Sequence, residues 1–200
     1  MDESILETIG SPLVRVESPE GVHIAAKIES FNPGGSAKDR PALYMIRRAE
    51  KSGDLSPGGE VIEATSGNTG IGLAMVCAVR GYDLTIVMPK SKSKERRQIM
   101  KAYGATIELI EGDMQTANQH AKNIAEKRDA VLISQFENPA NPQSHYETTA
   151  EEILEQIGER EIDAFVAGVG TGGTLTGVAS RLLEEFPDLD IYAVEPEQNA

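Results

Sequence analysis

The sequence contains 200 residues, 40% of them hydrophobic, which suffices for one or two globular domains with a buried core. The formal net charge of −13 excludes a typical nucleic-acid-binding protein, because phosphates bind to basic surfaces. The single cysteine, Cys77, lies in an apolar helical stretch, so we exclude a disulfide and a cysteine-based metal site and expect a core residue.

The N-terminus, Met1 to Ser4, lacks the basic and apolar regions of a signal peptide, and no apolar run is long enough to span a membrane. We therefore expect a soluble protein of the cytoplasm. Acidic residues are spread along the chain, which predicts an anionic, halophilic-like surface, since high salt relieves repulsion between like charges.

The first quarter of the chain combines extended pieces with one strong helix signal. Residues 1–21 begin with a short helical stretch and continue through a turn into an extended piece, and residues 22–28 alternate as in a strand. A turn rich in proline and glycine at residues 32–38 precedes a helix at residues 39–52.

From residue 59 onward, short apolar strands alternate with helices. We predict strands at residues 61–64, 84–88, 106–110, 130–134, 163–167 and 191–194, separated by helices at residues 71–80, after the basic segment 90–97, from a cap at 112–113 to about 127, at 145–157 and at 174–185. This alternation predicts an α/β fold with parallel strands in one sheet or two. A further helix would normally follow the last strand, so we expect a fragment of a longer protein or an incomplete second sheet.

Lys38 stands at the mouth of the helix predicted for residues 39–52. The positive end of the helix dipole disfavours an ammonium there, which lowers the pKa of the lysine toward a neutral, nucleophilic amine. Schiff-base chemistry with an aldehyde cofactor requires such an amine. An ordinary solvated lysine beside a loop is the alternative, so the case for chemistry depends on the other motifs.

The loop Thr65 to Gly70 joins a predicted strand to a predicted helix and carries hydroxyl, amide and glycine residues. Helix N-termini offer free N–H groups, so this loop suits a carboxylate or a phosphate. The alternative is a capped turn in which Ser66 or Thr69 caps the helix.

A second loop, Gly168 to Thr174, has the same placement and more glycine, which lets its backbone N–H groups and threonine hydroxyls approach a phosphate. Gly168, Gly170 and Gly173 also satisfy the dinucleotide pattern G-x-G-x-x-G. Glu195 follows the next strand, where a ribose-binding acid would lie. A nicotinamide-dependent dehydrogenase is therefore a serious alternative.

Three weaker features stay open. The segment 90–97 is basic, although a solvated helix face explains it. His145, beside Tyr146, suits either a proton shuttle or a hydrogen-bonded structural histidine. Gln135 follows a strand end, where α/β proteins keep their ligands.

The combination of motifs separates the two cofactor hypotheses. A dehydrogenase has no use for a lysine at a helix mouth or for a second anion-binding loop far upstream. A phosphorylated aldehyde cofactor with a carboxylate-bearing substrate uses all three sites, and pyridoxal phosphate is such a cofactor.

Together these motifs resemble the pyridoxal-phosphate-dependent cysteine synthase family, also called O-acetylserine sulfhydrylase, and its relative cystathionine β-synthase. The resemblance runs through residues 9–15, 32–40, 63–72, 88–97, 135–149 and 168–177. It implies a tryptophan-synthase-β-like α/β fold, fold type II, with two three-layer parallel-sheet domains. The smaller domain would span residues 39–143, and the larger one, incomplete at its C-terminus, residues 1–38 plus 144–200, with the active site between them.

The resemblance also implies a role for each motif residue. Lys38 would hold the cofactor as a Schiff base and move the substrate's α-proton. The substrate carboxylate would be bound by Thr65, Ser66, Asn68, Thr69 and Gln135, with Asn68 also beside the ring hydroxyl of the cofactor, and the cofactor phosphate by Gly170, Thr171, Gly172, Gly173 and Thr174.

The implied reaction is a β-replacement in which sulfide displaces the acetate of O-acetylserine, or the phosphate of O-phosphoserine, to give L-cysteine. Condensation of serine with homocysteine, as in cystathionine β-synthase, is the alternative within the family. The family also implies a homodimer and serine acetyltransferase as a partner. No residue here matches the family's partner of the pyridine nitrogen, so a non-catalytic relative is a further alternative.

Overall fold

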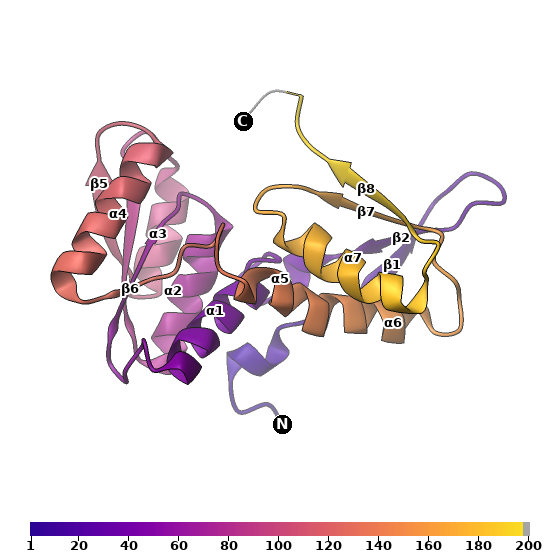
Figure 1. The fold of residues 1–200 in the computed structure, drawn as a ribbon, viewed down its shortest axis with the longest axis horizontal. Coiled ribbons are helices and arrows are strands. Elements are labelled where there is room, and N and C mark those ends of the chain that lie inside the picture. Colours follow the sequence, from indigo (N-terminus) through magenta and orange to yellow (C-terminus); the bar gives the residue numbers. More distant parts are fainter. Residues whose placement is uncertain (198–200) are drawn as a thin grey trace.

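A four-stranded parallel sheet forms the centre of one half of the molecule in the computed structural model, which describes residues 1–197 (Figure 1). Its strand order is β5 (Thr106–Ile110), β4 (Asp83–Pro89), β3 (Glu60–Ala64) and β6 (Val131–Leu132). All neighbouring pairs are parallel, with Ile62 of β3 opposite Thr85 of β4 and Leu132 of β6. The prediction of parallel strands is confirmed.

Helices cover both faces of this sheet. One apolar core lies between the sheet and three helices, α1 (Asp39–Ser52), α2 (Asn68–Arg80) and α3 (Lys94–Ala102), and a second core lies under α4 (Met114–Arg128). Val61 and Ile86 belong to the first core. Ile62 and Val87 belong to the second. Because both faces are covered, β4 is buried almost throughout. Cys77 is buried in the first core, as expected.

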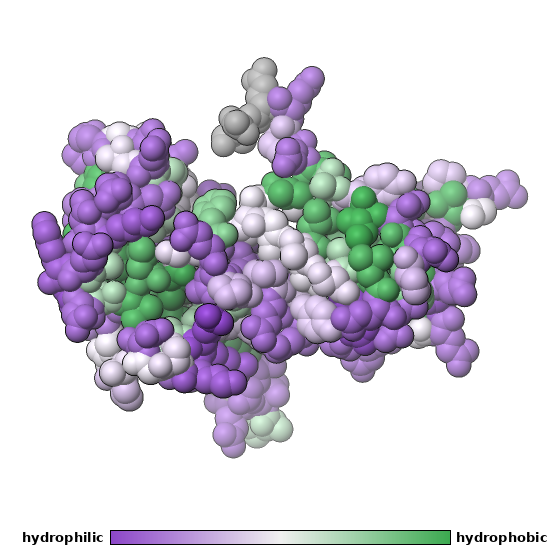
Figure 2. All heavy atoms as spheres, viewed as in Figure 1, coloured by the Kyte–Doolittle hydropathy of each residue, from purple (hydrophilic) through white to green (hydrophobic). Residues whose placement is uncertain are grey.

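The other half contains a two-stranded parallel sheet next to a helical layer. β7 (Ala164–Gly168) pairs with β8 (Asp190–Val194), and α7 (Gly173–Glu185) packs on β7. A helical stretch lies against α7 and consists of α5 (Ala140–Ser144), a π-helical turn (His145–Ala150) and α6 (Glu151–Ile157). β7 and β8 expose Val166, Tyr192 and Val194, and Figure 2 shows hydrophobic residues gathered over this region.

The segment before α1 forms an antiparallel hairpin between two short 3₁₀ helices. The 3₁₀ helices are Ile5–Thr8 and Glu29–Phe31, and the hairpin pairs β1 (Leu13–Val16) with β2 (Ile24–Lys27). The short helical start and the strand within residues 22–28 are thus confirmed, whereas the hairpin pairing was not predicted. Within residues 1–197, no helix combines the length and the apolar character that crossing a membrane requires.

Two predicted boundaries near the sheet were wrong. α2 begins at Asn68 rather than at residue 71, because Gly67 is the last extended residue and the rest of the loop forms the first helical turn. β6 ends at Leu132 rather than at Ser134, because Ser134 has a left-handed φ of 53° that turns the chain out of the sheet.

The helix predicted for residues 145–157 also begins earlier, at Ala140. Pro139 is the N-cap of α5, and Pro142 lies in its first turn. Proline is accepted in the first turn of a helix, where its missing N–H has no intrahelical partner. The π-helical turn at His145–Ala150 then joins α5 to α6 without a break.

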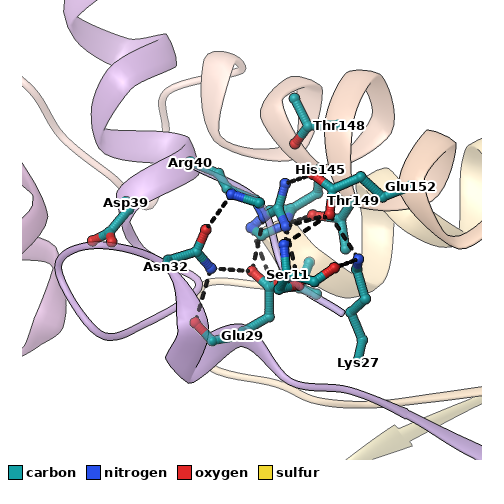
Figure 3. A network of polar contacts seen from close by, with 12 residues as sticks. Ser11, Lys27, Glu29, Asn32, Asp39, Arg40, His145, Thr148, Thr149 and Glu152 are labelled. Atoms are coloured by element: carbon teal, nitrogen blue, oxygen red, sulfur yellow. Dashed lines mark hydrogen bonds and ion pairs between the residues drawn. The ribbon is translucent and has the colours of Figure 1, made fainter. Parts of the chain in front are cut away.

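Arg40, in the first turn of α1, connects the N-terminal segment to α6 (Figure 3). Its guanidinium is fully buried and binds Glu29 through Nε at 2.8 Å and Glu152 of α6 through Nη2 at 2.8 Å. Nη2 also donates to the Ser11 hydroxyl at 3.2 Å. Lys27 of β2 is the second cation on Glu152, at 2.6 Å. One charged cluster therefore joins the N-terminal segment and the start of α1 to α6, which lies more than 100 residues later in the sequence.

The charges of this cluster stabilise one another. Burial alone would raise the pKa of Glu29 and of Glu152, but the hydrogen bonds and the positive charge of Arg40 lower both pKa values below those of ordinary carboxyl groups. Removing the arginine would leave two partly buried carboxylates that have lost their main partner.

We predict that Arg40→Leu lowers the free energy of unfolding by about 3–5 kcal/mol, because breaking a buried ion pair exposes the desolvation cost of its partners. Urea-induced unfolding measures this change. Arg128→Leu is the matched control, since exposed Arg128 pairs with Glu60 at 2.8 Å and should cost under about 1 kcal/mol. Equal losses in the two variants would contradict the prediction.

Candidate active site

Lys38 is the N-cap residue of α1 and lies partly buried at its first turn. Its position at the helix mouth is as predicted. Burial lowers the pKa of its amine, which is the direction that we expected for a lysine at this position. The carbonyl of Lys38 lies so close to α2 that a Cβ on Gly72 would approach it to 2.9 Å. The lysine therefore lies beside the helix that follows the Thr65–Gly70 loop.

The turn before Lys38 is closed by Asp39. The Asp39 carboxylate accepts a hydrogen bond from the backbone N–H of Gly34, and its Oδ1 occupies the space that a Cβ on Gly34 would need. Only glycine fits at position 34, because any side chain would collide with this carboxylate. Burial raises the pKa of Asp39 to about 6.

The loop after β3 meets the loop after β6. Thr69 donates from Oγ1 to Gln135 Oε1 at 2.6 Å, and both side chains are buried. The two loops meet because β3 and β6 are parallel neighbours whose carboxyl ends share one edge of the sheet. Gly67 is the N-cap of α2 and neither Ser66 nor Thr69 caps it, so the capped-turn alternative was wrong.

Other residues of the first loop lie at the start of α2. The Thr65 hydroxyl accepts a hydrogen bond from the Gly67 N–H at 3.3 Å, and Asn68 is the first helical residue. The Ser66 carbonyl accepts a long hydrogen bond from Arg96 at 3.4 Å. The N–H groups of Asn68 and Thr69 can therefore serve an external anion, because no side chain caps α2, whereas the Gly70 N–H donates to the Gly67 carbonyl.

Each glycine of the second loop has a different structural role. Gly172 is the N-cap of α7 and has a left-handed φ of 80°. Gly173 begins α7, and a Cβ there would collide with the side-chain amide of Asn141. At Gly170 no neighbouring atom lies within 4 Å of the position of a Cβ, so the space beside it is open. A ligand can therefore approach the backbone closely at Gly170.

His145 supports the second loop from the π-helical turn. Its Nδ1 lies 2.9 Å from the Thr149 hydroxyl and its Nε2 lies 3.2 Å from the Thr174 hydroxyl. Burial, together with the charge of Lys38, lowers the pKa of His145 to about 3, so the ring is neutral. Of the two roles left open by the sequence, these contacts favour the hydrogen-bonded histidine.

A cavity of about 130 Å³ lies between the Gln135 segment and the start of α7. Its lining includes Gln135, Asn141, Thr171, Gly172, Gly173 and Thr176. The structure thus brings Gln135, which was predicted to contact the substrate carboxylate, and the predicted phosphate loop to a common cavity. The basic segment 90–97 is mostly exposed, and Arg97 binds the carbonyls of Lys90 and Lys92, which agrees with a solvated face that stabilises its own turn.

Two residues of this region were missed in the sequence. Asn141 donates from Nδ2 to the Gln135 carbonyl and to the Thr171 hydroxyl, each at 2.9 Å. Glu63, at the end of β3, accepts a hydrogen bond from the Ser134 N–H at 2.8 Å. Glu63 thereby holds the left-handed turn that presents Gln135. Glu63 follows the apolar residues Val61 and Ile62 of β3, and a carboxylate at this interior position was the one signal that could have drawn attention to it.

The comparisons with known proteins agree with this arrangement. Residues 6–200 match the family model of the pyridoxal-phosphate dependent enzymes. A cysteine synthase of Staphylococcus aureus strain Mu50 is 48% identical over 193 residues, which cover 94% of this chain and 62% of that protein. An O-ureido-L-serine synthase of Streptomyces lavendulae is 47% identical over 202 residues, which cover 98% of this chain and 62% of that protein.

A solved structure is similar along the entire chain. The cysteine synthase of Entamoeba histolytica superposes with a TM-score of 0.94 at 42% identity, covering 100% of this chain and 62% of that one. The chain thus spans about 62% of the length of the relatives that it matches. The family match also means that the dehydrogenase alternative was wrong.

Glu63 gives the stability of the protein a distinct pH dependence. Burial raises the pKa of Glu63 to about 7. The folded state then binds a proton that the unfolded state, with its ordinary carboxyl pKa, has released. The free energy of unfolding therefore falls as the pH rises from about 5 to above 7.

We predict that, relative to Glu63→Gln, the wild type loses on the order of 2 kcal/mol of unfolding free energy between pH 5 and pH 8. The glutamine keeps an acceptor for the Ser134 N–H but does not titrate. Urea unfolding at several pH values measures the difference. Glu111→Gln, at an exposed carboxylate paired with Lys90, is the control and should follow the wild type. Parallel wild-type and Glu63→Gln curves would show the prediction to be wrong.

Proposed function

This chain belongs to the pyridoxal-phosphate-dependent enzymes, and we propose that it acts as a cysteine synthase, replacing the β-substituent of O-acetylserine or O-phosphoserine with sulfide to give L-cysteine. One observation supports the proposal: Lys38, whose pKa is lowered by burial, lies beside α2 and close enough to His145, which contacts Thr174 of α7, to lower the pKa of that histidine. The N-termini of α2 and α7 have no side-chain cap and suit anions. One terminus suits the substrate carboxylate and the other the cofactor phosphate.

The residues present fit the cofactor. Gly170, Thr171, Gly172, Gly173 and Thr174 would bind its phosphate, because the backbone is open at Gly170 and the hydroxyls and N–H groups lie at the start of α7. Lys38 would bind its aldehyde carbon, and Asn68 would lie beside its ring hydroxyl. When bound, the cofactor supplies an electron sink for the charge that develops at the substrate's α-carbon.

The chain's own residues would perform the remaining tasks. Thr65, Ser66, Asn68, Thr69 and Gln135 would bind the substrate carboxylate, and the hydrogen bond between Thr69 and Gln135 keeps two of these groups together. The Lys38 amine would accept the substrate's α-proton at Nζ, since burial brings its pKa closer to neutrality. Neutral His145 would hold Thr174 in place rather than shuttle protons.

The choice of nucleophile and donor is a separate question. A cysteine synthase and an O-ureido-L-serine synthase are similar to this chain at 48% and 47% identity, so overall identity does not distinguish their products. We propose sulfide because several of the similar proteins are cysteine synthases. Condensation of serine with homocysteine remains the alternative.

The wider assembly is also part of the proposal. We propose a smaller domain at residues 39–143 and a larger one at residues 1–38 plus 144–200, of which residues 198–200 lie outside the described part. The two parallel sheets, within residues 60–132 and 164–194, support this division.

The hypothesis also includes a homodimer in the cytoplasm, serine acetyltransferase as a partner and a salt-tolerant anionic surface. The net charge of −13 supports the anionic surface.

We predict that the purified chain with pyridoxal phosphate shows the visible absorption band of the lysine-bound cofactor, and that O-acetylserine shifts this band. Lys38→Ala should abolish the band and reduce cysteine formation from O-acetylserine and sulfide by more than roughly a hundredfold. Lys94→Ala, at an exposed lysine of α3, is the control and should behave as the wild type. A band that survives Lys38→Ala would contradict the proposed role of this lysine.

A further inference from the structure

Asn141 occupies a buried position between the two parts of the site. Only 2% of the residue is exposed, and both hydrogens of its Nδ2 are used, one on the Gln135 carbonyl and one on the Thr171 hydroxyl, each at 2.9 Å. The orientation of the amide is fixed, because the Gln135 carbonyl can only accept and therefore requires the NH₂ group.

The neighbouring loop is shaped to receive this side chain. The Asn141 carbonyl oxygen lies against the α-carbon of Gly173, where any Cβ would collide with it. That oxygen is buried and has no hydrogen-bond partner among the described residues. The Asn141 oxygen thus fits closely against the loop but accepts no hydrogen bond. Asn141 therefore contributes through its NH₂ group.

The contacts of Thr171 decide which way its hydroxyl hydrogen points. Thr171 Oγ1 accepts from Asn141 Nδ2 at 2.9 Å and from the Gly173 N–H at 3.4 Å. A hydroxyl has two acceptor lone pairs and one hydrogen to donate. With both lone pairs occupied, the hydroxyl is left as a donor, which is the state that an anion requires.

Asn141 also completes a hydrogen-bonded path across the site. Thr69 donates to the side chain of Gln135, and the carbonyl of Gln135 accepts from Asn141, which in turn donates to Thr171. This path connects the start of α2 with the loop before α7. The path therefore provides a continuous set of hydrogen bonds between Gln135 and the Thr171 hydroxyl.

We propose that Asn141 is a positioning residue that presents the Thr171 hydroxyl as a donor to a bound phosphate and couples this loop to the Gln135 segment. The inference rests on the proposed function, because the phosphate is that of the cofactor. Asn141 itself does not touch the phosphate and acts through Thr171.

The test measures binding of inorganic phosphate to the 200-residue chain through the NMR amide signals of residues 170–174. Asn141→Ala should weaken binding roughly three- to tenfold, the value of one oriented hydrogen bond. Thr171→Val should weaken it at least as much, and the double variant should be no weaker than Thr171→Val alone. In the wild type, phosphate should also shift the Gln135 amide, and Asn141→Ala should remove that shift.

Two further variants keep the test decisive. Asn141→Asp preserves the shape of the side chain but cannot donate, so it should weaken phosphate binding more than tenfold even if Asn141→Ala folds poorly. Asn138→Ala is the matched control, because Asn138 makes two comparable hydrogen bonds in the same segment, with Ile133 and Ala140, and none with Thr171. Its phosphate affinity should stay within about twofold of the wild type.

The outcomes separate this inference from the proposed function. Additive losses in the double variant, or unchanged binding in Asn141→Asp, would overturn the positioning role while the site still binds phosphate. A folded wild type that binds neither inorganic phosphate nor pyridoxal phosphate would overturn the proposed function, and this inference with it. Non-additive losses confined to Asn141 and Thr171 support it.

Discussion

The buried ion pairs of Arg40 are the constraint on which the site depends most. Arg40 follows Lys38 by two residues, so fixing its guanidinium between Glu29 and Glu152 also fixes the first turn of α1 and the lysine at its start. A buried arginine requires such partners, because its charge cannot be left unpaired away from water. The position of Lys38 is therefore set by carboxylates 9 residues before and 114 residues after it in the sequence.

Parallel strand pairing provides the second constraint. The carboxyl ends of β3 and β6 lie at the same edge of the sheet, which brings Thr69 and Gln135 into hydrogen-bond contact across 66 residues of sequence. Glu63 reinforces this contact from the end of β3 by holding the turn at Ser134. Sheet topology thus positions the Thr65–Gly70 loop as the Arg40 cluster positions Lys38, by holding together segments that are distant in the sequence.

Local signals explain how much of this could be predicted from the sequence. The proline- and glycine-rich turn and the helix at residues 39–52 were predicted correctly, because caps and breakers act within a few residues. Strand and helix alternation likewise predicted the parallel sheet. The sequence analysis did not predict the partners of Arg40, the role of Glu63 or the hydrogen bonds of Asn141, because each depends on residues that meet only in the folded chain. The start of α2 was missed for a related reason, since Gly67 gives no side-chain cap to recognise.

The site also shows how burial changes the charges of titratable groups in an acidic protein. Burial lowers the pKa of Lys38 and of His145, and it raises the pKa of Asp39 and of Glu63, so each group is moved toward its neutral form. The charge of Arg40 is matched by its two carboxylates. Oriented N–H and hydroxyl groups at the starts of α2 and α7 then add to the attraction for a carboxylate or phosphate, together with Arg96, which contacts the Ser66 carbonyl beside α2. Such dipoles act only at short range, so the direction in which each donor points affects anion binding. An amide that orients one hydroxyl can therefore affect the binding of an anion that it does not touch.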